Sequence, residues 1–364
     1  MKVALVHDYL NQYGGAERVL KALTEMFPEA PIFTLFYDAR ATNQEFARSR
    51  IVTSFLDAIP LVKRHHRLFP LVMPNAIERL DLRGYDVVIS DSDSFAKGVL
   101  TDPGAIHICY CHTPARFLWD GSQRYLQEHV CVRALRAVAS LGLTYLRVWD
   151  YEASKRVDYF VANSQFVAKR IAKYYRKQAA VIYPPVSLNH FSNHIYQKAD
   201  YYLLLMRLVP YKHPEIVIKA FNQLALRLKV VGDGPLLPVL RALAKKNIEF
   251  VGSLPHESVD SYYGEAKALL FPQEEDFGIS AVEACAAGTP VIAYRGGGAL
   301  EIIKEGVNGT FFSEQTPQSL ISGVKAFQKI RFNDNIIKAS AVKFNEERFK
   351  REFIEFIYKL TPNS

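Results

Sequence analysis

Short apolar segments alternate with helix-like segments along the whole chain, and this alternation restricts the possible folds more than any other feature of the sequence. Such alternation is typical of parallel β-sheets whose strands are joined by covering helices. In the first half, the segments with strand character are KVALVHD, PIFTLFY, IVTSF, DVVIS, IHICYCH and DYFVAN. The same pattern starts again in the second half with YYLLLM, LKVVG, IEFVG, ALLFP, PVIAY and TFFS. We therefore expect an α/β protein with two parallel-sheet domains.

Two adjacent prolines separate the halves. Tyr183-Pro184-Pro185-Val186 stands between the strand-like segments of the first half and those of the second. Adjacent prolines interrupt both helix and sheet and stiffen a connector. A chain of 364 residues is also too long for one comfortable core. We expect one domain over residues 1–183 and a second over residues 184–344, followed by an amphipathic helix over residues 345–364.

The composition narrows the choice of partners. A net charge of +8 and a pI near 9.1 indicate an anionic partner. We do not expect nucleic acid, because the sequence contains no zinc finger, RNP-like aromatic motif or basic repeat. A nucleotide diphosphate and an anionic membrane surface remain as candidates. No apolar run approaches the ~20 residues of a membrane span, and MKVALVHDYL turns polar too early for a signal peptide, so we expect a cytoplasmic protein.

The four cysteines are Cys109, Cys111, Cys131 and Cys285. The spacing of Cys109 and Cys111 differs from that of zinc ligands, and disulfides are rare in the cytoplasm. We therefore expect buried, free thiols.

The segment PQEEDFGISAVEACAAGTPVIAY, residues 272–294, carries the strongest functional signal. Glu275 lies just before an apolar helix, where free N–H groups and the positive end of the helix dipole favour an anion. Glu283 lies within that helix, where a buried carboxylate needs a hydrogen-bond partner. The segment therefore offers two acceptors for hydroxyl groups and one cradle for phosphate, and a nucleotide sugar needs both.

A second motif follows the strand-like segment YYLLLM. Arg207 and Lys212 lie five residues apart in the loop between this segment and the helix-like PEIVIKAFNQL. Ligands bind where strands of a parallel sheet lead into helices. The guanidinium fork and the compact ammonium group together suit a diphosphate, although an Arg and a Lys in a loop are often only solvated surface groups.

Two weaker signals lie in the first half. Gly14 and Gly15 stand between the first strand and the first helix, where paired glycines permit close approach of a phosphate or sugar to the backbone. His112 stands at the end of the strand IHICYCH, within CHTPARFLWD. A histidine at a strand end is also common as a purely structural residue.

Together these motifs resemble the retaining glycosyltransferases of family 4. The segment after Pro272 matches their E-x7-E signature and departs from it only in Asp276, where a glycine is usual. Arg207 and Lys212 match the R-x4-K element, GGAER matches the glycine-rich start of the first helix, and His112 matches a strand-end histidine. The resemblance spans nearly the whole chain. It implies the GT-B fold, with two Rossmann-like domains facing a cleft and a last helix that packs back on the first domain.

The resemblance also assigns roles to residues. Arg207 and Lys212 would hold the leaving nucleotide, Glu275 the hydroxyl groups of the sugar, Glu283 the ribose, and His112 would lie beside the transferred sugar. The catalytic set is therefore Glu275, His112, Arg207 and Lys212. The donor-binding set is Gly14, Gly15, Arg207, Lys212, Asp276, Phe277, Gly278, Ile279 and Glu283. The motif C-H-T-P-x-R-x-x-W-D resembles bacterial mannosyltransferases of O-antigen assembly. This resemblance implies that the transferred sugar is mannose and that the donor is GDP-mannose.

Asp91-Ser92-Asp93 could be mistaken for a metal site, because a D-x-D motif holds a divalent metal in other glycosyltransferases. Here the motif stands between the strand-like DVVI and the helix-like FAKGVL, where Ser and Asp commonly cap helices. We therefore expect a helix cap and no requirement for a metal or another cofactor.

The acceptor is less visible in the sequence. Residues 59–80 mix the basic cluster KRHHR with Leu68, Phe69, Leu71 and Val72. Such a segment can lie on an anionic membrane surface, and it can equally be a solvated helix face. We expect a lipid-linked or growing polysaccharide acceptor of bacterial surface glycan synthesis, with possible peripheral contact at the inner face of the plasma membrane.

Five alternatives stay open or are disfavoured. A UDP-sugar could replace GDP-mannose. A nucleotide-sugar epimerase, or a sugar phosphorylase that needs pyridoxal phosphate, could use a similar scaffold. A catalytically silent sugar-nucleotide binding protein is disfavoured because every charged motif residue is retained. A NAD-dependent dehydrogenase is disfavoured because Gly232-Asp233-Gly234-Pro235 lacks the third glycine of the dinucleotide motif.

Overall fold

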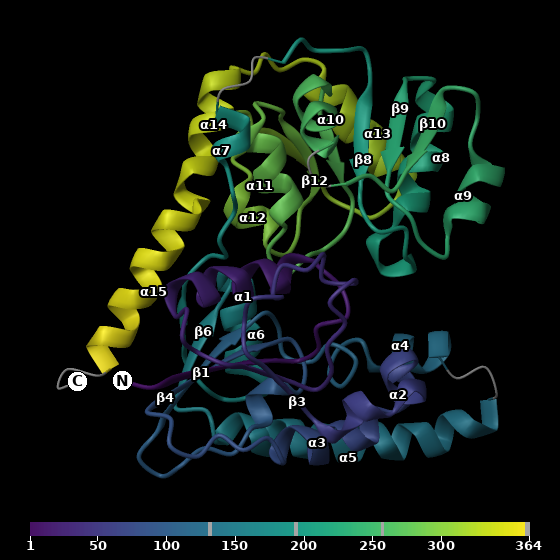
Figure 1. Cartoon of the computed structure of the whole chain (residues 1–364). Coiled ribbons are helices and arrows are strands. Elements are labelled where there is room, and N and C mark those ends of the chain that lie inside the picture. The colour runs from purple at the N-terminus through teal and green to yellow at the C-terminus, as the bar shows by residue number, and fades with distance from the viewer. Residues whose placement is uncertain (130–132, 193–195, 256–257, 361–364) are drawn as a thin grey trace. The chain divides into compact units, whose positions relative to one another are not determined.

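The computed structural model describes residues 1–129, 133–192, 196–255 and 258–360 (Figure 1). The chain divides into two compact units, one formed by Met1–Pro185 with Phe349–Ser364 and the other by Val186–Arg348. The division falls two residues after the expected boundary at residue 183. Cys109, Cys111 and Cys285 are buried and form no disulfide, as predicted. Cys131 lies outside the described residues.

The first unit contains a parallel sheet of seven strands in the order β3-β2-β1-β4-β5-β6-β7. Its strands are β1 Val3–His7, β2 Ile32–Thr34, β3 Ile51–Thr53, β4 Val87–Ser92, β5 Ile106–Cys111, β6 Tyr159–Ala162 and β7 Ala179–Val181. Every strand predicted for this half is present. The structure adds β7, which the sequence did not signal because it is short, half-buried and built from two alanines and a valine.

Helices connect these strands. The α-helices of this unit are α1 Gly15–Met26, α2 Pro60–Arg64, α3 Met73–Glu78, α4 Ser122–His129, α5 Arg133–Lys155 and α6 Gln165–Tyr174. Short 3-10 helices are η1 Phe55–Ala58, η2 His66–Leu68, η3 Pro70–Val72 and η4 Ala96–Gly98. Ser164, which follows β6, caps α6 by accepting a hydrogen bond from the backbone N–H of Val167.

The central strand β1 is buried along its whole length. Ala4 and Val6 belong to one apolar cluster, whereas Val3 and Leu5 belong to another, so both faces of the sheet are covered. Burial on both faces explains why this strand reads as a continuous apolar run. The last helix, α15 Glu346–Leu360, contributes to the second cluster through Phe349, Phe353 and Ile357, which recur every four residues.

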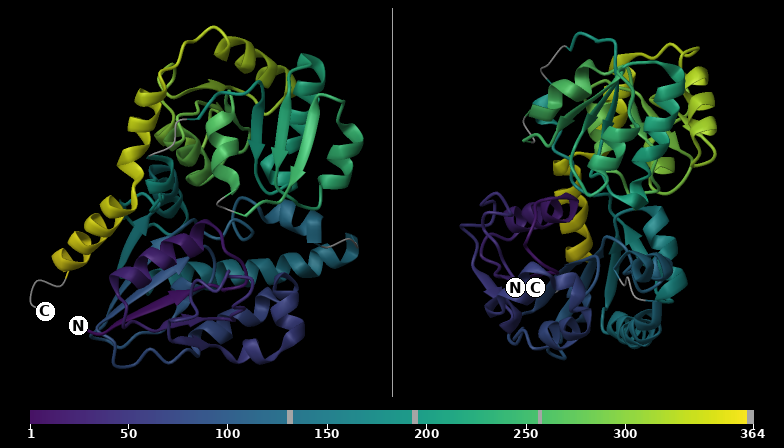
Figure 2. Two further views of the ribbon diagram at one scale, coloured as in Figure 1. Left: turned by 45° about the horizontal axis from the view of Figure 1, so that its top comes forward. Right: turned by 90° about the vertical axis from the view of Figure 1, so that its right-hand side faces the viewer.

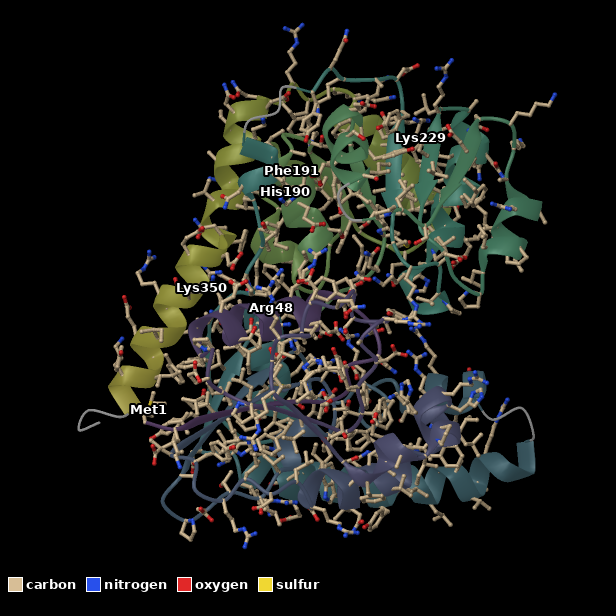
Figure 3. The ribbon with its side chains drawn as sticks, in the orientation of Figure 1. Met1, Arg48, His190, Phe191, Lys229 and Lys350 are labelled. Carbon is tan, nitrogen blue, oxygen red and sulfur yellow. The ribbon has the colours of Figure 1, made fainter. Side chains whose placement is uncertain are left out.

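A charged contact also joins α15 to the start of the chain. The ammonium group of Lys350 (labelled in Figure 3) donates to Glu25 Oε2 at 2.6 Å, near the end of α1. Because this ion pair is partly exposed, it contributes little to stability. The attachment of α15 therefore depends mainly on its buried apolar side chains, Phe349, Phe353 and Ile357.

The second unit contains a parallel sheet of six strands in the order β10-β9-β8-β11-β12-β13, with helices on both sides (Figure 2). Its strands are β8 Tyr202–Leu205, β9 Leu228–Val231, β10 Ile248–Gly252, β11 Leu269–Phe271, β12 Val291–Tyr294 and β13 Gly309–Phe312. Its helices are α7 Asn189–Ser192, η5 Pro210–Lys212, α8 Pro214–Leu224, α9 Leu237–Leu243, α10 Val259–Glu265, α11 Ile279–Ala286, α12 Ala299–Ile302, α13 Pro317–Phe327, α14 Asp334–Ala341 and η7 Val342–Phe344. Every strand predicted for this half is present.

Both sheets contain a point where the strand order reverses. In the first unit β1 pairs with β2 on one side and β4 on the other, and in the second unit β8 pairs with β9 and β11. The loops that follow these paired strands leave the sheet in opposite directions and open a crevice, which is where open α/β sheets bind ligands. The loops after β1, β4, β8 and β11 are therefore the parts of the fold that position a site.

No helix in the described ranges combines the length and the apolar character that crossing a bilayer requires.

The attachment of α15 to the first unit gives the first testable prediction. Phe353 is fully buried, so Phe353→Ala should lower the free energy of unfolding of that unit by about 3–5 kcal/mol. Tyr358, on the same helix, is 61% exposed and supplies the matched control, because Tyr358→Ala should change stability by less than about 0.5 kcal/mol. Urea denaturation followed by tryptophan fluorescence measures both, since Trp119 and Trp149 both lie in the first unit. Equal effects of the two substitutions would contradict the packing.

Candidate functional site

The second unit brings Lys212 and Glu275 together at the carboxyl edge of its sheet. Lys212 Nζ lies 2.9 Å from Glu275 Oε1, although the residues belong to loops after different strands, β8 and β11. Burial alone would lower the pKa of the Lys212 ammonium, but the negative charge of Glu275 outweighs it, and the net pKa lies above the usual value. Lys212 is therefore held as a cation. Arg207 is exposed and close enough for its charge to act on Lys212 in the opposite direction.

The loop that carries Arg207 is fixed by the neighbouring loop after β9. The N–H of Leu208 donates to Asp233 O at 2.8 Å, and the N–H of Leu236 donates to Leu208 O at 3.1 Å. A Cβ atom on Gly234 would lie 2.4 Å from Leu208 O, so only glycine allows this approach. Helix α9 begins only at Leu237, because residues in the preceding turn hold the Arg207 loop.

The start of α11 lies next to the Lys212–Glu275 pair in the chain. Gly278 precedes the helix with φ +115°, and a Cβ atom there would also come within 2.9 Å of Phe271 Cζ. Ile279 begins the helix, whose first N–H groups have no partner within it. Asp276 is half-buried just before this positive end, where the helix dipole stabilises its charge. The side chain of Phe277 is buried against Phe344, so Phe277 presents only its backbone to a ligand.

Glu283 lies in the middle of α11 and is 6% exposed. Its Oε2 accepts a hydrogen bond from Tyr263 Oη at 2.8 Å. Tyr263, on α10, is itself fixed, because Thr289 Oγ1 donates to its carbonyl oxygen at 2.6 Å. The predicted need for a partner at Glu283 is thus met by a tyrosine twenty residues earlier in the chain, which no local pattern in the sequence could indicate.

A glycine loop that the sequence analysis did not single out packs on the Glu275 loop. Gly296, Gly297 and Gly298 follow β12, and the N–H of Gly298 donates to Glu275 O at 2.9 Å. A Cβ atom on Gly297 would lie 2.3 Å from Glu275 O, and one on Gly298 2.3 Å from Phe277 O. Three consecutive glycines after a predicted strand were a usable signal for this contact. The loop fixes the backbone that presents Glu275.

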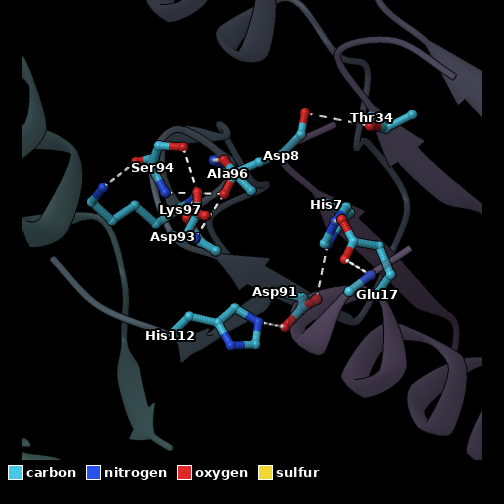
Figure 4. Close-up of polar contacts among 12 residues, drawn as sticks. His7, Asp8, Glu17, Thr34, Asp91, Asp93, Ser94, Ala96, Lys97 and His112 are labelled. Carbon is cyan, nitrogen blue, oxygen red and sulfur yellow. Dashed lines mark hydrogen bonds and ion pairs between the residues drawn. The ribbon is translucent and has the colours of Figure 1, made fainter. Parts of the chain in front are cut away.

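The first unit holds a row of buried charged groups that connects Gly14 to His112 (Figure 4). His112 Nε2 lies 2.6 Å from Asp91 Oδ1, and Asp91 Oδ2 lies 2.9 Å from His7 Nδ1. The other nitrogen of His7, Nε2, is 3.7 Å from Glu17 Oε1. Glu17 in turn accepts a hydrogen bond from the N–H of Gly14 at 2.7 Å and lies in the first turn of α1, which Gly15 begins. We call this row, from Glu17 through His7 and Asp91 to His112, the histidine network.

In the histidine network, the carboxylates favour the charged form of the histidines, and the histidines favour the charged form of Asp91. Burial opposes the charged form of each group, but the carboxylates of Asp91 and Glu17 raise the pKa of His7 well above its ordinary value. Asp91 likewise raises the pKa of His112, and both histidines hold the pKa of Asp91 below its ordinary value despite burial. The network therefore favours the protonated form of His112 and fixes the orientation of its ring at the end of β5.

Of Asp91-Ser92-Asp93, which we predicted to cap a helix, only Ser92 makes a contact of this kind: its Oγ accepts a hydrogen bond from the backbone N–H of Lys97 at 3.3 Å. Asp91 and Ser92 are the last residues of β4, and the following FAKGVL contains only the 3-10 turn η4, whose own N-cap residue, Phe95, makes no side-chain hydrogen bond. Because Asp91 opposes His7 across the sheet, its carboxylate is held by the two histidines.

The N–H groups of the loop after β4 are instead satisfied by Asp8, the residue after β1. Its Oδ2 accepts from Asp93 and Ser94 at 2.7 and 3.0 Å, and its Oδ1 accepts from Phe95 and Ala96 at 2.6 Å each. The capping oxygen atoms thus come from a residue more than eighty positions earlier. In the described ranges, no three His, Cys, Asp or Glu side chains gather as a metal-binding group.

The predicted site residues therefore fall into two groups. Arg207, Lys212, Glu275, Glu283 and the residues 276–279 lie in the second unit, whereas Gly14, Gly15 and His112 lie in the first. Each group is assembled at the carboxyl ends of its own sheet.

Comparison with known proteins gives two family matches. Residues 186–343 match the model described as "Glycosyl transferases group 1", and residues 13–190 match "Glycosyltransferase Family 4". Among curated relatives, an uncharacterized glycosyltransferase of Methanocaldococcus jannaschii is 30% identical over 175 residues, which is 46% of this chain and 49% of the relative. A "GDP-mannose-dependent alpha-(1-6)-phosphatidylinositol monomannoside mannosyltransferase" of Mycolicibacterium smegmatis is 33% identical over 29% of this chain and 32% of the relative. The chain thus spans about half or less of the length of these relatives.

Solved structures resemble the chain over its whole length. The Anabaena protein Alr3699/HepE, crystallised in complex with UDP, covers 99% of this chain and 100% of its own with a TM-score of 0.71 at 18% identity. This similarity concerns the fold.

The histidine network predicts a dependence of stability on pH. Because the pKa values of His7 and His112 are raised above 6.5, their contribution is fully present below pH 6.5 and is lost as the pH rises through the raised values. Because the pKa of Asp91 is lowered below 3.8, its contribution is present above pH 3.8 and is lost in acid. Tryptophan-monitored urea denaturation from pH 4 to 9 should therefore show stability of the first unit falling as the pH rises above about 6.5.

The same titration with Asp91→Asn should show a weaker dependence above pH 6.5 and a loss of roughly 3–5 kcal/mol at pH 6, since two buried cations lose their carboxylate. Asp81→Asn is the matched control, because Asp81 is exposed and pairs only with Arg83 on the surface. An unchanged pH profile in Asp91→Asn would contradict the network.

Proposed function

Because the chain belongs to the family 4 glycosyltransferases and has their GT-B fold of two Rossmann-like domains, we propose that it transfers a hexose from a nucleotide sugar to an acceptor hydroxyl group with retention of configuration. The ion pair between Lys212 and Glu275 carries this proposal. It places a fixed cation and a hydroxyl acceptor side by side at the strand-order reversal of the second unit, next to the N-terminus of α11.

Each group in the second unit would act on a part of the donor. The bond between the anomeric carbon and the phosphate oxygen breaks, and the electron pair leaves with the nucleotide diphosphate. Arg207, Lys212 and the first N–H groups of α11 would stabilise this developing negative charge. Glu275 would hold sugar hydroxyl groups, and Glu283, oriented by Tyr263, would hold the ribose.

The acceptor oxygen would form the new bond on the same face of the sugar that the phosphate leaves. Its proton passes to the leaving phosphate, so that no enzyme nucleophile is required and the configuration is retained. His112, kept protonated by Asp91, would donate a hydrogen bond to the transferred sugar. A hydrogen-bond donor that is already fixed in place orients the sugar, and it does not have to move when the transition state forms.

For the donor we propose GDP-mannose. The support is the mycobacterial relative, whose name records a GDP-mannose-dependent mannosyltransferase, and the segment CHTPARFLWD, residues 111–120. A UDP-sugar is the second candidate, because the Anabaena protein of similar fold was crystallised with UDP. For the acceptor we propose a lipid-linked or growing polysaccharide of bacterial surface glycan synthesis.

We also propose that transfer needs no divalent metal. Both carboxylates of the D-x-D pattern are already engaged, Asp91 by two histidines and Asp93 by a hydrogen bond that its Oδ1 accepts from Ser94 Oγ at 2.7 Å. The cationic groups Arg207 and Lys212 would supply the charge that a metal supplies elsewhere.

A donor panel tests the nucleotide and the metal together. Thermal unfolding measured with GDP-mannose, UDP-glucose and ADP-glucose in EDTA should show the largest stabilisation with GDP-mannose. At a concentration a hundred times its Kd, a ligand stabilises the folded state by about 2.7 kcal/mol. Greater stabilisation by UDP-glucose would overturn the proposed donor, and stabilisation that appears only after Mg²⁺ is added would overturn the proposal on the metal.

Substitutions test the roles of the ion pair. Lys212→Ala should lower kcat by about 10²–10³-fold, because it removes charge stabilisation from the transition state. Glu275→Gln keeps the shape of the side chain and should lower kcat/KM by at least about tenfold through loss of orientation. Lys219→Ala, at an exposed position on α8, is the matched control and should leave the rate unchanged. Full transfer activity in either site variant would remove that residue from the mechanism.

A further inference from the structure

Helix α5 carries an apolar stripe on its exposed side. Val138, Leu141, Tyr145 and Val148 are spaced three, four and three residues apart, so they share one face of the helix. Their exposed fractions are 66%, 73%, 59% and 60%. Leu143 and Leu146 face the other way and are buried in the core of the first unit. A helix that packs on a core normally shows polar residues outward, so this second apolar face needs an explanation.

The stripe continues onto the segment that connects α2 with α3. Leu71 lies against α5, because a Cβ atom on Gly142 would be 3.5 Å from both of its methyl carbons. Leu71 is 53% exposed and Leu68 is 62% exposed. The inner sides of the two elements share one core cluster, to which Val62 and Met73 contribute along with the leucines of α5. We call the outward side chains of Val138, Leu141, Tyr145, Val148, Leu68 and Leu71 the α5 surface, which lies on α5 and on the short helices η2 and η3 (α5 is labelled in Figure 1).

The charge around the α5 surface has one sign. Residues 58–77 contain three Lys or Arg residues and no Asp or Glu, and the same is true of residues 129–149. Arg64 and Arg67 are exposed next to Leu68 in the chain. The first acidic group on the outer face of α5 is Glu152, which is paired with Lys155 at 2.7 Å and marks the end of the stripe. The surface is therefore both apolar and cationic.

We propose that the α5 surface docks on an anionic phospholipid bilayer. Exposed Leu, Val and Tyr side chains flanked by arginines, without acidic residues between them, match the composition of segments that lie in a membrane interface. Anionic headgroups attract each Lys or Arg near the surface by about 1 kcal/mol. A protein partner would have to bury this stripe and also supply carboxylates to both basic segments, whereas a bilayer meets both requirements with lipid alone. The proposed lipid-linked acceptor would lie in the same bilayer, and only this last link rests on the proposed function.

Flotation of the full chain with liposomes tests the docking. Binding is expected to vesicles of phosphatidylcholine with 30% phosphatidylglycerol at low salt, and little binding to pure phosphatidylcholine. Arg64→Gln with Arg67→Gln should lower the partition coefficient by about fivefold per arginine at low salt, and high salt should reduce this difference. Leu141→Ser with Tyr145→Ser should lower it at least tenfold at both salt concentrations, because apolar contact is not screened.

Matched controls come from the second unit. Val239→Ser with Ile336→Ser removes apolar side chains that are 63% and 53% exposed, and Lys325→Gln with Lys329→Gln removes exposed charge. Neither control should change binding. All the substituted side chains are exposed, so the variants should keep the Tm of the unaltered protein.

Three outcomes would overturn the proposal. They are equal binding to neutral and anionic vesicles, unchanged binding of the Leu141→Ser and Tyr145→Ser variant, and a concentration-dependent dimer in light scattering that this variant abolishes. In the last case a second copy of the chain, not a bilayer, covers the stripe. The thermal shift caused by GDP-mannose should be the same in the variant and the unaltered protein, so that failure of the docking and failure of the proposed transferase activity can be told apart.

Discussion

In each unit, one central strand pairs in parallel with a neighbour on both sides, and this pairing determines which charged side chains meet at the carboxyl edge of the sheet. Strand β8 pairs with β9 and β11, so the loops that follow these strands meet at one edge of the sheet and bring Arg207, Lys212 and Glu275 together. Strand β1 pairs with β2 and β4 in the same way, and its carboxyl end brings His7 beside Asp91. In both units, groups that are distant in sequence become neighbours because they follow paired strands.

Three of the buried carboxylates in the described part of the chain are stabilised in different ways. Asp8 accepts four hydrogen bonds from backbone N–H groups, Asp91 is placed between two histidines, and Glu283 accepts from a tyrosine. The first arrangement fixes the loop after β4 through backbone N–H groups. The second makes the charge of His112 depend on its neighbours, because the carboxylate of Asp91 favours the protonated form of the imidazole.

The sequence predicted the strands well because their signals are local, and the spacings that mark the two second-unit loops are local as well. Apolar runs mark the strands, and the E-x7-E and R-x4-K spacings mark the two loops. The errors arose where a partner comes from far along the chain. Asp91 was assigned to a cap because neither His7 nor Asp8 can be placed beside it without the register of β1 against β4. Tyr263 was missed for the same reason, whereas β7 was missed because alanines give no strand pattern.

The return of α15 to the first unit has a consequence for how the protein is made. The second unit, Val186–Arg348, is one uninterrupted stretch of chain, so it can fold as soon as it leaves the ribosome. The first unit begins earlier but lacks Phe349, Phe353 and Ile357 until the whole second unit has been synthesised. During that interval the apolar face that α15 later covers stays open to solvent. The domain that is synthesised first is therefore the one that is completed last, and it is the one more exposed to chaperones and to premature termination.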